Sequence, residues 1–501
     1  MVRFLVLLFT GFLFIHAEQL PLSHPIYDLL TPLQTRNLLP RLNGLPKPYD
    51  AADVIQALQA LDTLSLTPLD RLRQEEAKTS LHQRMTAVKS QRLLIAVDEA
   101  LEGGSDADGH YLTRHALAGY FTYGRFSLVN RVAVDLTSEK WRYDHLRRRF
   151  KKTLFADMPE AYASYTGEHF GLLMGRNRVK WGPGHTGSLM LGDHQSGLTQ
   201  MAGYARFGFL QGFTLSAKLD SIGAWNRYFS AAKLVIQLHS TLTLALNQSI
   251  VYAGPARNFE LFYVLPSFIY YFGQFGFIPK NATDNVFVGA DMEWKPLIGL
   301  RVYFEFLADD FQVDRDSISA SVQNGIAYLL GAESQDILFN GLNLGAEFVH
   351  INSYVYKHVG GLATSYVTNL HGGTLGHAIG PDAEMVEIRL SKRLYMHAKA
   401  GMTYRLTRRG DLNDPLGEWN AYDKRKEATP HGRVENCHDF LLTGETTYWK
   451  GLTVGAEAGY RFVQSPDNQP GQKKEGIISG RLTYYFDRLL QWDDKATLFP
   501  L

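Results

Sequence analysis

Apolar and polar residues alternate over most of the chain, in segments of about 9–12 residues. From Leu452 to Phe462 every second residue is apolar or alanine, while Glu457 and Arg461 lie among the residues between them. Side chains of a strand point alternately to its two faces, so this pattern predicts β-strands with one apolar and one polar face. Similar segments begin at Leu300, Ala398 and Ile478.

The connections between these segments favour a membrane barrel over a soluble sandwich, whose strands also alternate. Short turns are expected near 239–240, 295–299 and 449–451, and long polar connections at 309–323, 352–382, 408–437 and 464–475. Outer-membrane barrels combine short periplasmic turns with long external loops, and aromatic residues gather near their strand ends. We therefore expect an all-β fold, a closed antiparallel transmembrane β-barrel of 16–18 strands over residues 91–490.

The first 90 residues follow other patterns. Residues 1–17 have one early arginine, an apolar stretch and a small residue at the end, which is typical of a secretory signal peptide. Residues 18–48 are rich in proline and leucine and predict an extended connector. Helical periodicity then predicts a pair of helices, Asp50–Leu64 and Thr67–Val88, so that 18–90 forms a periplasmic unit with a possible periplasmic partner. Residues 491–501 would form a periplasmic C-terminal extension.

Composition excludes several classes of function. Lys and Arg number 51 against 50 Asp and Glu, without the basic stripe of a nucleic-acid-binding protein. The single cysteine, Cys437, excludes an internal disulfide. The chain has no serine elbow, His-Glu-x-x-His motif or phosphate loop, so we expect a binding protein without a cofactor or metal, and no enzyme. A hydrolase whose Ser and His meet only in the folded chain stays an alternative.

Charged residues on the polar strand faces would point into the barrel lumen. They would either pair with one another and fill the interior, or bind the hydroxyl groups of a sugar. Composition does not separate these two interpretations. The set comprises Asp291, Glu293, Arg301, Glu305, Asp309, Glu387, Arg389, Arg393, Lys399, Arg405, Glu445, Glu457, Arg461 and Arg481.

The stretch GRNRVKWGPGHTGSLML, residues 175–191, joins an alternating strand to a rigid corner. Arg176 and Arg178 would share one strand face. Pro183 fixes its own φ, and Gly182 and Gly184 can adopt backbone angles closed to other residues. Trp181 would then lie beside a row of cations. The corner is either a tight turn with an anchoring tryptophan or part of a binding surface.

A second stretch, Asp284–Phe311, predicts a strand, a tight turn and a strand that carries Glu305 and Asp309 into the lumen. The acidic spacing is that of a strand and differs from a calcium-binding loop, so it does not predict a metal site. Two further histidines, His371 and His377, lie in a glycine-rich segment, which predicts a flexible loop instead of a metal site.

Both stretches resemble the Wzi capsule-assembly family, outer-membrane barrels that bind surface polysaccharide. The resemblance covers roughly residues 90–490 and implies 18 strands, outer-membrane lipids as surroundings and a capsular or related polysaccharide as partner. A general porin of the same fold is the alternative function. The polysaccharide-binding residues that we expect are Arg176, Arg178, Lys180, Trp181, Gly182, Pro183, Gly184, Asp291, Glu305 and Asp309.

Overall fold

The computed structural model describes most of the chain. The described residues are 18–61, 66–81, 94–106, 111–123, 125–137, 148–151, 154–195, 197–265, 269–272, 284–309, 325–358, 362–368, 373–395, 397–416, 429–448 and 452–484. The expected signal peptide and the expected C-terminal extension lie outside these residues.

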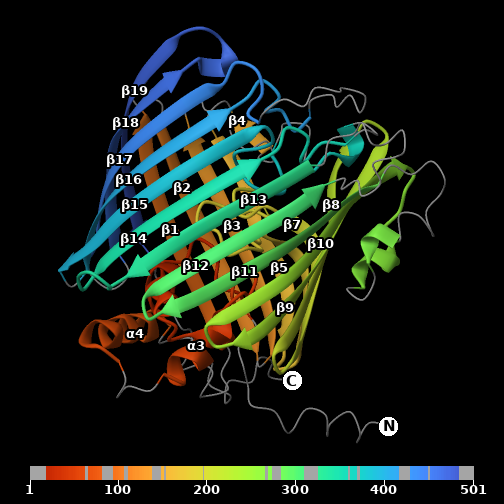
Figure 1. Ribbon diagram of the computed structural model, residues 1–501. Helices are drawn as coiled ribbons and strands as arrows, with labels where there is room; N and C mark the ends of the chain where they lie inside the picture. The colour runs from red at the N-terminus through yellow and green to blue at the C-terminus, as the bar shows by residue number, and fades with distance from the viewer. Residues whose placement is uncertain are drawn as a thin grey trace, which may run out of the picture.

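The described chain is mainly β-strand, with short helices near its start (Figure 1). The helices are α2 (Ile26–Thr35), α3 (Ala51–Gln59) and α4 (Pro68–Ser80), with 3-10 turns η1 (Pro40–Leu42), η2 (Leu261–Val264), η4 (Leu362–Thr364) and η5 (Pro466–Asn468). The strands are β1 (Leu94–Asp106), β2 (Tyr111–Tyr123), β3 (Phe126–Thr137), β4 (Arg148–Lys151), β5 (Leu154–Thr166), β6 (Phe170–Asn177), β7 (Leu198–Phe207), β8 (Leu210–Ile222), β9 (Trp225–His239), β10 (Leu242–Pro255), β11 (Asn285–Leu297), β12 (Leu300–Asp309), β13 (Gly325–Gln335), β14 (Leu342–Ile351), β15 (Ala383–Tyr395), β16 (Ala398–Arg409), β17 (Glu435–Tyr448), β18 (Leu452–Gln464) and β19 (Gln472–Tyr484).

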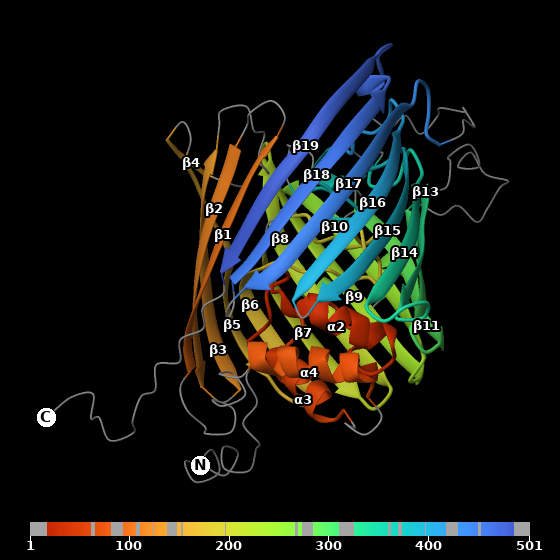
Figure 2. The same ribbon diagram turned by 90° about the vertical axis from the view of Figure 1, so that its left-hand side faces the viewer.

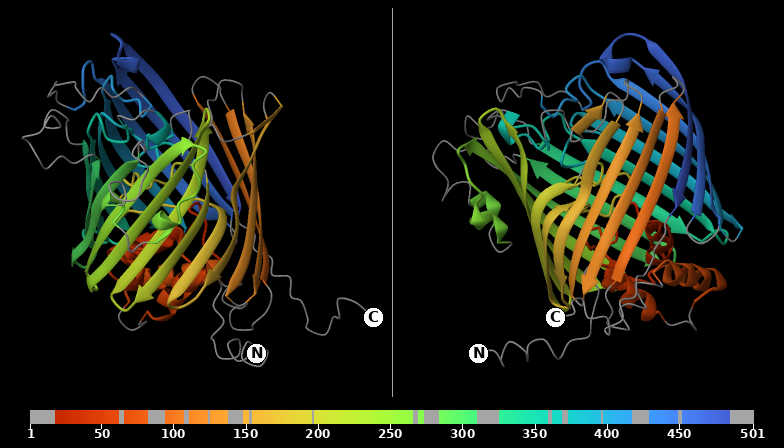
Figure 3. Two further views of the ribbon diagram at one scale, coloured as in Figure 1. Left: turned by 90° about the vertical axis from the view of Figure 1, so that its right-hand side faces the viewer. Right: turned by 180° about the vertical axis from the view of Figure 1, so that it is seen from behind.

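All these strands belong to one antiparallel sheet that curves around an interior (Figures 1 and 3). Neighbours in the chain pair with each other, except that β3 pairs with β5. Strands β1 and β19 pair at two positions, Ser105 with Ile478 and Asp106 with Ile477. The sheet holds 19 strands among the described residues, one more than the upper end of the expected range. The additional strand is β4, whose four residues are too few for alternation to show.

The apolar strand faces point outward, as the alternation predicts. On β18 and β19 the apolar residues Val454, Tyr460 and Ile478 are 40%, 43% and 69% exposed. On β12 the opposite face carries Glu305 and Asp309, which are buried in the interior. A solvated sandwich would show the reverse arrangement, with its apolar faces buried between two sheets.

A substitution at Val454 measures whether the outward face meets lipid. Val454→Arg is expected to lower the free energy of unfolding by about 2–4 kcal/mol if this position lies near the bilayer midplane. The neighbouring Glu457→Gln should cost far less, because Glu457 points to the polar side of β18. Urea unfolding of the two variants in lipid vesicles tests this difference. Equal tolerance would contradict a lipid-facing surface.

Short and long connections alternate, with three exceptions, the first of which is the four-residue connection 107–110 between β1 and β2. Strands β9 and β10 are joined by a tight turn, as are β11 and β12, whereas 352–382 and 410–434 are long. At the end that carries the long connections, β8 and β9 are joined by only two residues, and the connection 465–471 between β18 and β19 is shorter than the expected 464–475. Part of the expected loop 309–323 lies outside the described residues.

The N-terminal unit contains three helices where a pair was expected. The prediction of an extended connector over 18–48 is wrong at α2, which includes Pro32. An interior proline costs a helix about 3 kcal/mol. However, Ile26, Leu30 and Leu33 are spaced as one helical stripe and are fully buried, so burial of this stripe outweighs the proline.

The two expected helices are present as α3 and α4, and α4 begins as predicted. The backbone N–H of Asp70 donates to the hydroxyl of Thr67 over 3.2 Å, and Pro68 occupies the first helical position. The C-terminal part of the longer expected helix, 82–88, lies outside the described residues. No helix among the described residues is long and apolar enough to cross a membrane.

The N-terminal unit lies against the end of the sheet that carries the short turns (Figure 2). Arg73 of α4 forms an ion pair with Asp336 in the turn between β13 and β14, at 2.5 Å. Arg206 on β7 donates to Asp53 of α3 at 2.7 and 2.8 Å. The helices therefore bury their apolar stripes within the N-terminal unit, while ion pairs join the unit to this end of the sheet. A periplasmic partner for them stays a prediction.

From η1 the chain continues into the interior. Lys47 forms an antiparallel bridge with Lys180, with two backbone hydrogen bonds of 2.8 Å. The Lys47 ammonium lies 5.3 Å from the ring centre of Tyr27. Burial, together with the positive charge of Lys180, lowers the pKa of Lys47 to about 8. The bridge joins the N-terminal unit to the segment that follows β6.

The interior contains a large apolar core on the side of the sheet from β8 to β15. Inward-facing residues of the strands contribute to it, and so do residues of two connections that fold inward. The first connection is formed by residues 178–195 and 197, which we call the inner segment. The second is formed by the described residues 352–358, 362–368 and 373–382, which we call the second inner segment. The core includes Trp181, Leu189, Leu191, Leu215, Phe229, Val235, Phe287, Leu307, Leu329, Val349, Tyr356, Tyr366 and Leu375.

Candidate functional site

The inner segment leaves the sheet where β6 ends at Asn177. It crosses the interior without forming a strand, apart from the bridge at Lys180, and returns to the sheet at β7. The expected strand face shared by Arg176 and Arg178 is therefore absent, because β6 stops between the two residues.

Glu305 on β12 holds the inner segment from the wall side. One carboxylate oxygen accepts the backbone N–H of Gly184 at 3.0 Å, and the other accepts that of Leu189 at 2.8 Å. The Ser188 hydroxyl lies 3.0 Å from the same second oxygen. A carboxylate that accepts several buried N–H groups replaces the partners that these groups would have in a helix or sheet.

Glu347 on β14 holds the next part of the same segment. It accepts the backbone N–H of His185 at 2.6 Å and that of Thr186 at 2.9 Å. The hydroxyl of Tyr303 also donates to it, at 2.6 Å. Glu347 was not among the predicted site residues. The alternation of β14 could have placed it in the interior, but its partners are about 160 residues away along the chain.

The Trp-Gly-Pro-Gly corner lies inside the protein. Trp181 is only 4% exposed, and its backbone N–H donates to the carbonyl of Leu191 at 2.9 Å. Gly182 and Gly184 do not use the backbone freedom that glycine offers, since neither has a positive φ. A Cβ atom on Gly182 would instead lie 2.3 Å from Glu305 Oε1, and one on Gly184 would lie 2.5 Å from the carbonyl oxygen of Gly187. The corner requires glycine because other atoms approach closely.

The three predicted cations do not form one row beside Trp181. Arg176 lies 3.6 Å from Asp157, whereas Arg178 donates to the carbonyl oxygen of Asp193 at 2.6 Å. Lys180 lies 3.4 Å from the Asp193 carboxylate. Arg176 therefore contacts a residue of β5, whereas Arg178 and Lys180 both contact Asp193 of the inner segment.

The other two predicted carboxylates are also engaged. Asp291 on β11 forms a buried ion pair with Lys233 of β9 at 2.5 Å. Asp309, at the end of β12, accepts the backbone N–H of Tyr356 at 2.9 Å and so holds the second inner segment. The structure thus places Asp291, Glu305 and Asp309 in the lumen, as expected, and gives each a structural contact. Whether these residues also contact a polysaccharide stays a prediction.

Arg227 on β9 anchors the second inner segment to the wall. Its guanidinium is fully buried and donates to the carbonyl oxygens of Ala363 at 2.6 Å, Val367 at 2.8 Å and Ser365 at 2.9 Å. The sequence pattern did not single out this residue, because nothing in β9 indicates which carbonyls it will meet. A buried guanidinium has five N–H donors to satisfy, and the chain around η4 supplies most of their acceptors, with the carbonyl of Asp220 on β8 as a further one at 3.3 Å.

His377 is buried in the second inner segment, so the prediction of a flexible loop is wrong at this position. Its Nδ1 accepts the N–H of Ile379 at 3.3 Å, and burial lowers the pKa of His377 to about 3. The neutral ring therefore carries its proton on Nε2, which lies 3.0 Å from the Thr186 hydroxyl. A histidine that donates to a hydroxyl is not placed to remove its proton, so this pair lacks the geometry of an activated nucleophile.

No group of three or more His, Cys, Asp or Glu side chains in the described part of the chain is arranged to hold a metal ion. His371 lies outside that part.

Many of the lumen-facing charges pair with one another. Glu293 accepts from Lys295 and Arg301, both at 3.0 Å. The series continues across β13, β15 and β16 through Arg301–Glu333 at 3.2 Å, Arg389–Glu333 at 2.9 Å, Arg389–Glu387 at 2.7 Å and Arg405–Glu387 at 2.6 Å. We call this series the charge belt. Arg301 also donates to the carbonyl of Pro183 at 2.9 Å, so the Trp-Gly-Pro-Gly corner contacts the charge belt.

At the end of the belt and next to it, three arginines, one of them the belt residue Arg405, expose part of their guanidinium side chains on the polar side of the sheet. Arg409, Arg405 and Arg461 are 37–39% exposed, whereas their partners Glu435, Glu387 and Asp439 are at most 16% exposed. We call these three residues the arginine row. The carboxylates are less exposed than the guanidinium groups, so N–H donors of the three arginines are accessible from the interior.

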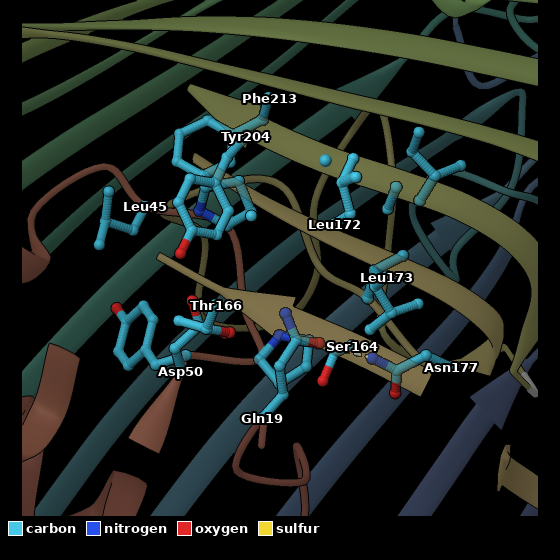
Figure 4. A pocket seen from close by; sticks show the side chains of 18 of the residues that line it. Gln19, Leu45, Asp50, Ser164, Thr166, Leu172, Leu173, Asn177, Tyr204 and Phe213 are labelled. Atoms are coloured by element: carbon cyan, nitrogen blue, oxygen red, sulfur yellow. Dashed lines mark hydrogen bonds between the residues drawn. The ribbon is translucent and has the colours of Figure 1, made fainter. Parts of the chain in front are cut away.

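Two small cavities lie where the N-terminal unit meets the sheet. One, of about 70 Å³, is bordered by Gln19, Leu45 and Asp50 on one side and by Tyr204 and Phe213 on the other (Figure 4). The other, of about 100 Å³, adjoins the corner at Lys180 and His185. Both are far smaller than the several hundred cubic ångströms of a typical ligand pocket.

Comparison with known proteins gives a consistent result. The family description of capsule assembly protein Wzi matches residues 102–476. A solved structure titled as Wzi of Escherichia coli, an outer-membrane protein involved in group 1 capsule assembly and a carbohydrate-binding β-barrel, superposes with a TM-score of 0.64 at 14% identity, covering 93% of this chain and 99% of that one. OccD3 of Pseudomonas aeruginosa has a TM-score of 0.46 at 11% identity, covering 78% and 91%. No curated protein sequence matches the chain.

Proposed function

Because the chain belongs to the Wzi capsule assembly family and is located in the outer membrane, we propose that it is a polysaccharide-binding barrel. In this proposal the sheet closes through β1 and β19, and the protein helps attach or assemble a capsular or related surface polysaccharide. It acts by binding and not as an enzyme.

The observation that carries this proposal is the packed interior. Glu305, Glu347 and Arg227 hold two inner segments across the side of the lumen from β8 to β15, and an apolar core fills the space between them and the wall. A general porin needs a water-filled passage through its lumen. A lumen packed along the side from β8 to β15 suits a scaffold that presents a binding surface on its remaining side, so it favours binding over diffusion.

The arginine row is the surface that we assign to the polymer. Guanidinium groups donate to hydroxyl and carboxylate oxygens of sugars, and Arg405, Arg409 and Arg461 are already oriented by their less exposed carboxylate partners. In this proposal the corner residues from Arg176 to Gly184 do not contact the polymer, because Trp181 is buried. They stabilise the interior of the barrel instead.

Glycan binding by purified, vesicle-reconstituted protein tests the assignment. Replacing both Arg405 and Arg461 by Gln should weaken polysaccharide binding about 10-fold or more, since hydrogen bonds to charged groups contribute about 1.5–3 kcal/mol each. Polysaccharide binding by the parent protein should weaken with added salt, because exposed charges are screened over about 10 Å at 0.1 M.

Two further variants separate the possible outcomes. Arg408→Gln is the matched control, because Arg408 lies between Thr407 and Arg409 on β16 and therefore points to the outward face. If the double variant binds like the parent while Trp181→Ala loses binding and still assembles, the corner is the contact and our assignment is wrong. In planar bilayers, steady conductance of the parent protein typical of a porin would contradict the proposed function itself.

A further inference from the structure

The outward face of the sheet is buried in one region, near the long-connection end of β9 and β10. Elsewhere on the described strands, outward apolar residues are exposed or half-buried, and Leu234 and Leu246 on these same strands are exposed. Further along the same face, Tyr228, Ile250 and Tyr252 are at most 9% exposed. Alternation places them on the outside of the wall, so chain from elsewhere must cover them there.

The covering chain is the connection between β10 and β11. Its described residues 256–265 and 269–272, which include η2, lie beside the outer surface of the sheet, and we call them the outer flap (Figures 1 and 3). Tyr263 and Tyr270 of the flap are buried in one cluster with Tyr228, Ile250 and Tyr252 of the wall. The ring centres of Tyr252 and Tyr263 are 5.0 Å apart.

Hydrogen bonds fix the outer flap in this position. The Thr214 hydroxyl of β8 donates to the carbonyl of Val264 at 2.8 Å, and the N–H of Tyr270 donates to the Gln248 side chain of β10 at 2.9 Å. Within the connection, the Tyr263 hydroxyl donates to Asp284 at 3.1 Å, and Arg257 forms an ion pair with the same carboxylate. The flap is therefore attached at both of its described parts.

The flap explains why the wall is polar beneath it. Thr214, Ser216, Ser230 and Gln248 lie on outward faces of β8, β9 and β10, where lipid would leave their polar groups unpaired. Thr214 and Gln248 instead bond to the flap backbone, and the hydroxyls of Ser216 and Ser230 lie 2.9 Å from each other. The polar residues of the wall are thus paired when the outer flap covers this part of the sheet.

The far side of the flap is strongly apolar. The connection reads PARNFELFYVLPSFIYYF from residue 255 to 272, with Arg257 and Glu260 as its charged residues. Its large apolar side chains point away from the wall at exposures of 47–73%, in contrast to the polar connections expected outside a barrel. The exposed residues are Leu261, Leu265, Ile269, Tyr271 and Phe272.

We propose that the outer flap is a lipid-contact site in which these residues insert among the acyl chains of the outer leaflet. The argument for lipid over a protein partner is continuity. Leu234, Leu246 and Val288 on the strands that carry the flap are exposed apolar residues of the wall, which would face acyl chains in the same membrane. The flap extends this apolar band outward from the wall, and the exposed Tyr271 suits the boundary between chains and head groups. The site anchors the barrel to its leaflet independently of polysaccharide binding.

Spin labelling of the full chain in lipid vesicles tests the site. In a Cys437→Ala background, Leu265→Cys carries a nitroxide label, and the protein is reconstituted in phosphatidylcholine vesicles. We expect the oxygen-to-nickel collision ratio to be several-fold higher at Leu265 than at Gln469→Cys, an exposed position between β18 and β19. Val288→Cys is the matched lipid-facing control, and the Leu265 label should behave like it.

Two outcomes would overturn the proposal. A Leu265 label that collides with the water-soluble nickel chelate as often as the Gln469 label shows that the flap is in water. A label shielded from both oxygen and nickel shows that protein covers it, and this result would favour a second copy of the chain or another partner. Phe272→Cys gives an independent reading if Leu265→Cys does not fold.

Discussion

Glu305→Ala should lower the free energy of unfolding by about 3–6 kcal/mol, which is among the largest effects that we expect of a single substitution. The change leaves the N–H groups of Gly184 and Leu189 and the Ser188 hydroxyl without the carboxylate that they contact. Each buried donor left without an acceptor costs about 1–3 kcal/mol. Urea unfolding of the vesicle-reconstituted protein measures the loss.

The same variant has a local consequence that distinguishes it from a general defect. The inner segment should detach while the strand ladder stays paired, because Glu305 bonds to the segment through its side chain and to β11 and β13 through its backbone. Conductance in planar bilayers should then rise above that of the parent. Glu457→Ala is the control, since Glu457 lies on the polar side of β18, away from the inner segment. An unfolding free energy unchanged from the parent in both variants would contradict the role of Glu305.

Arg227→Met is expected to release the second inner segment from the wall. Methionine retains much of the apolar volume but has no donor for the carbonyls of Ala363, Ser365 and Val367. With three carbonyls deprived of their partner, we expect a loss of about 3 kcal/mol or more. Limited proteolysis within residues 352–382 should become faster, and unfolding should occur at lower urea concentration.

Arg408→Met is the matched control for that experiment. Arg408 also forms an ion pair, with Glu384 at 2.6 Å, but its side chain is 42% exposed. Exposed ion pairs contribute about 0–1 kcal/mol, so this variant should stay close to the parent. If the two substitutions cost the same, the carbonyl contacts of Arg227 are not the source of its effect.

Sequence alone determined the wall of this protein. Alternation along β18 and β12 placed Val454 outside and Glu305 inside, and the structure confirms both orientations. These predictions succeed because the direction of a strand side chain depends on its own backbone and on its immediate neighbours. The resemblance carried by residues 175–191 and 284–311 likewise identified the family, since a motif is a local property of the chain.

Tertiary structure decided what fills and covers that wall. Whether Trp181 is exposed depends on the path of the inner segment, which Glu305 and Glu347 determine from positions more than 100 residues away. Tertiary contacts also decide whether α2 forms, because burial of its apolar stripe stabilises the helix despite the interior Pro32. The outer flap has an apolar sequence that alone could belong in a core, and only its docking on β8–β10 leaves that sequence exposed. Side-chain contacts between distant segments set these outcomes, and periodicity within one segment carries no information about them.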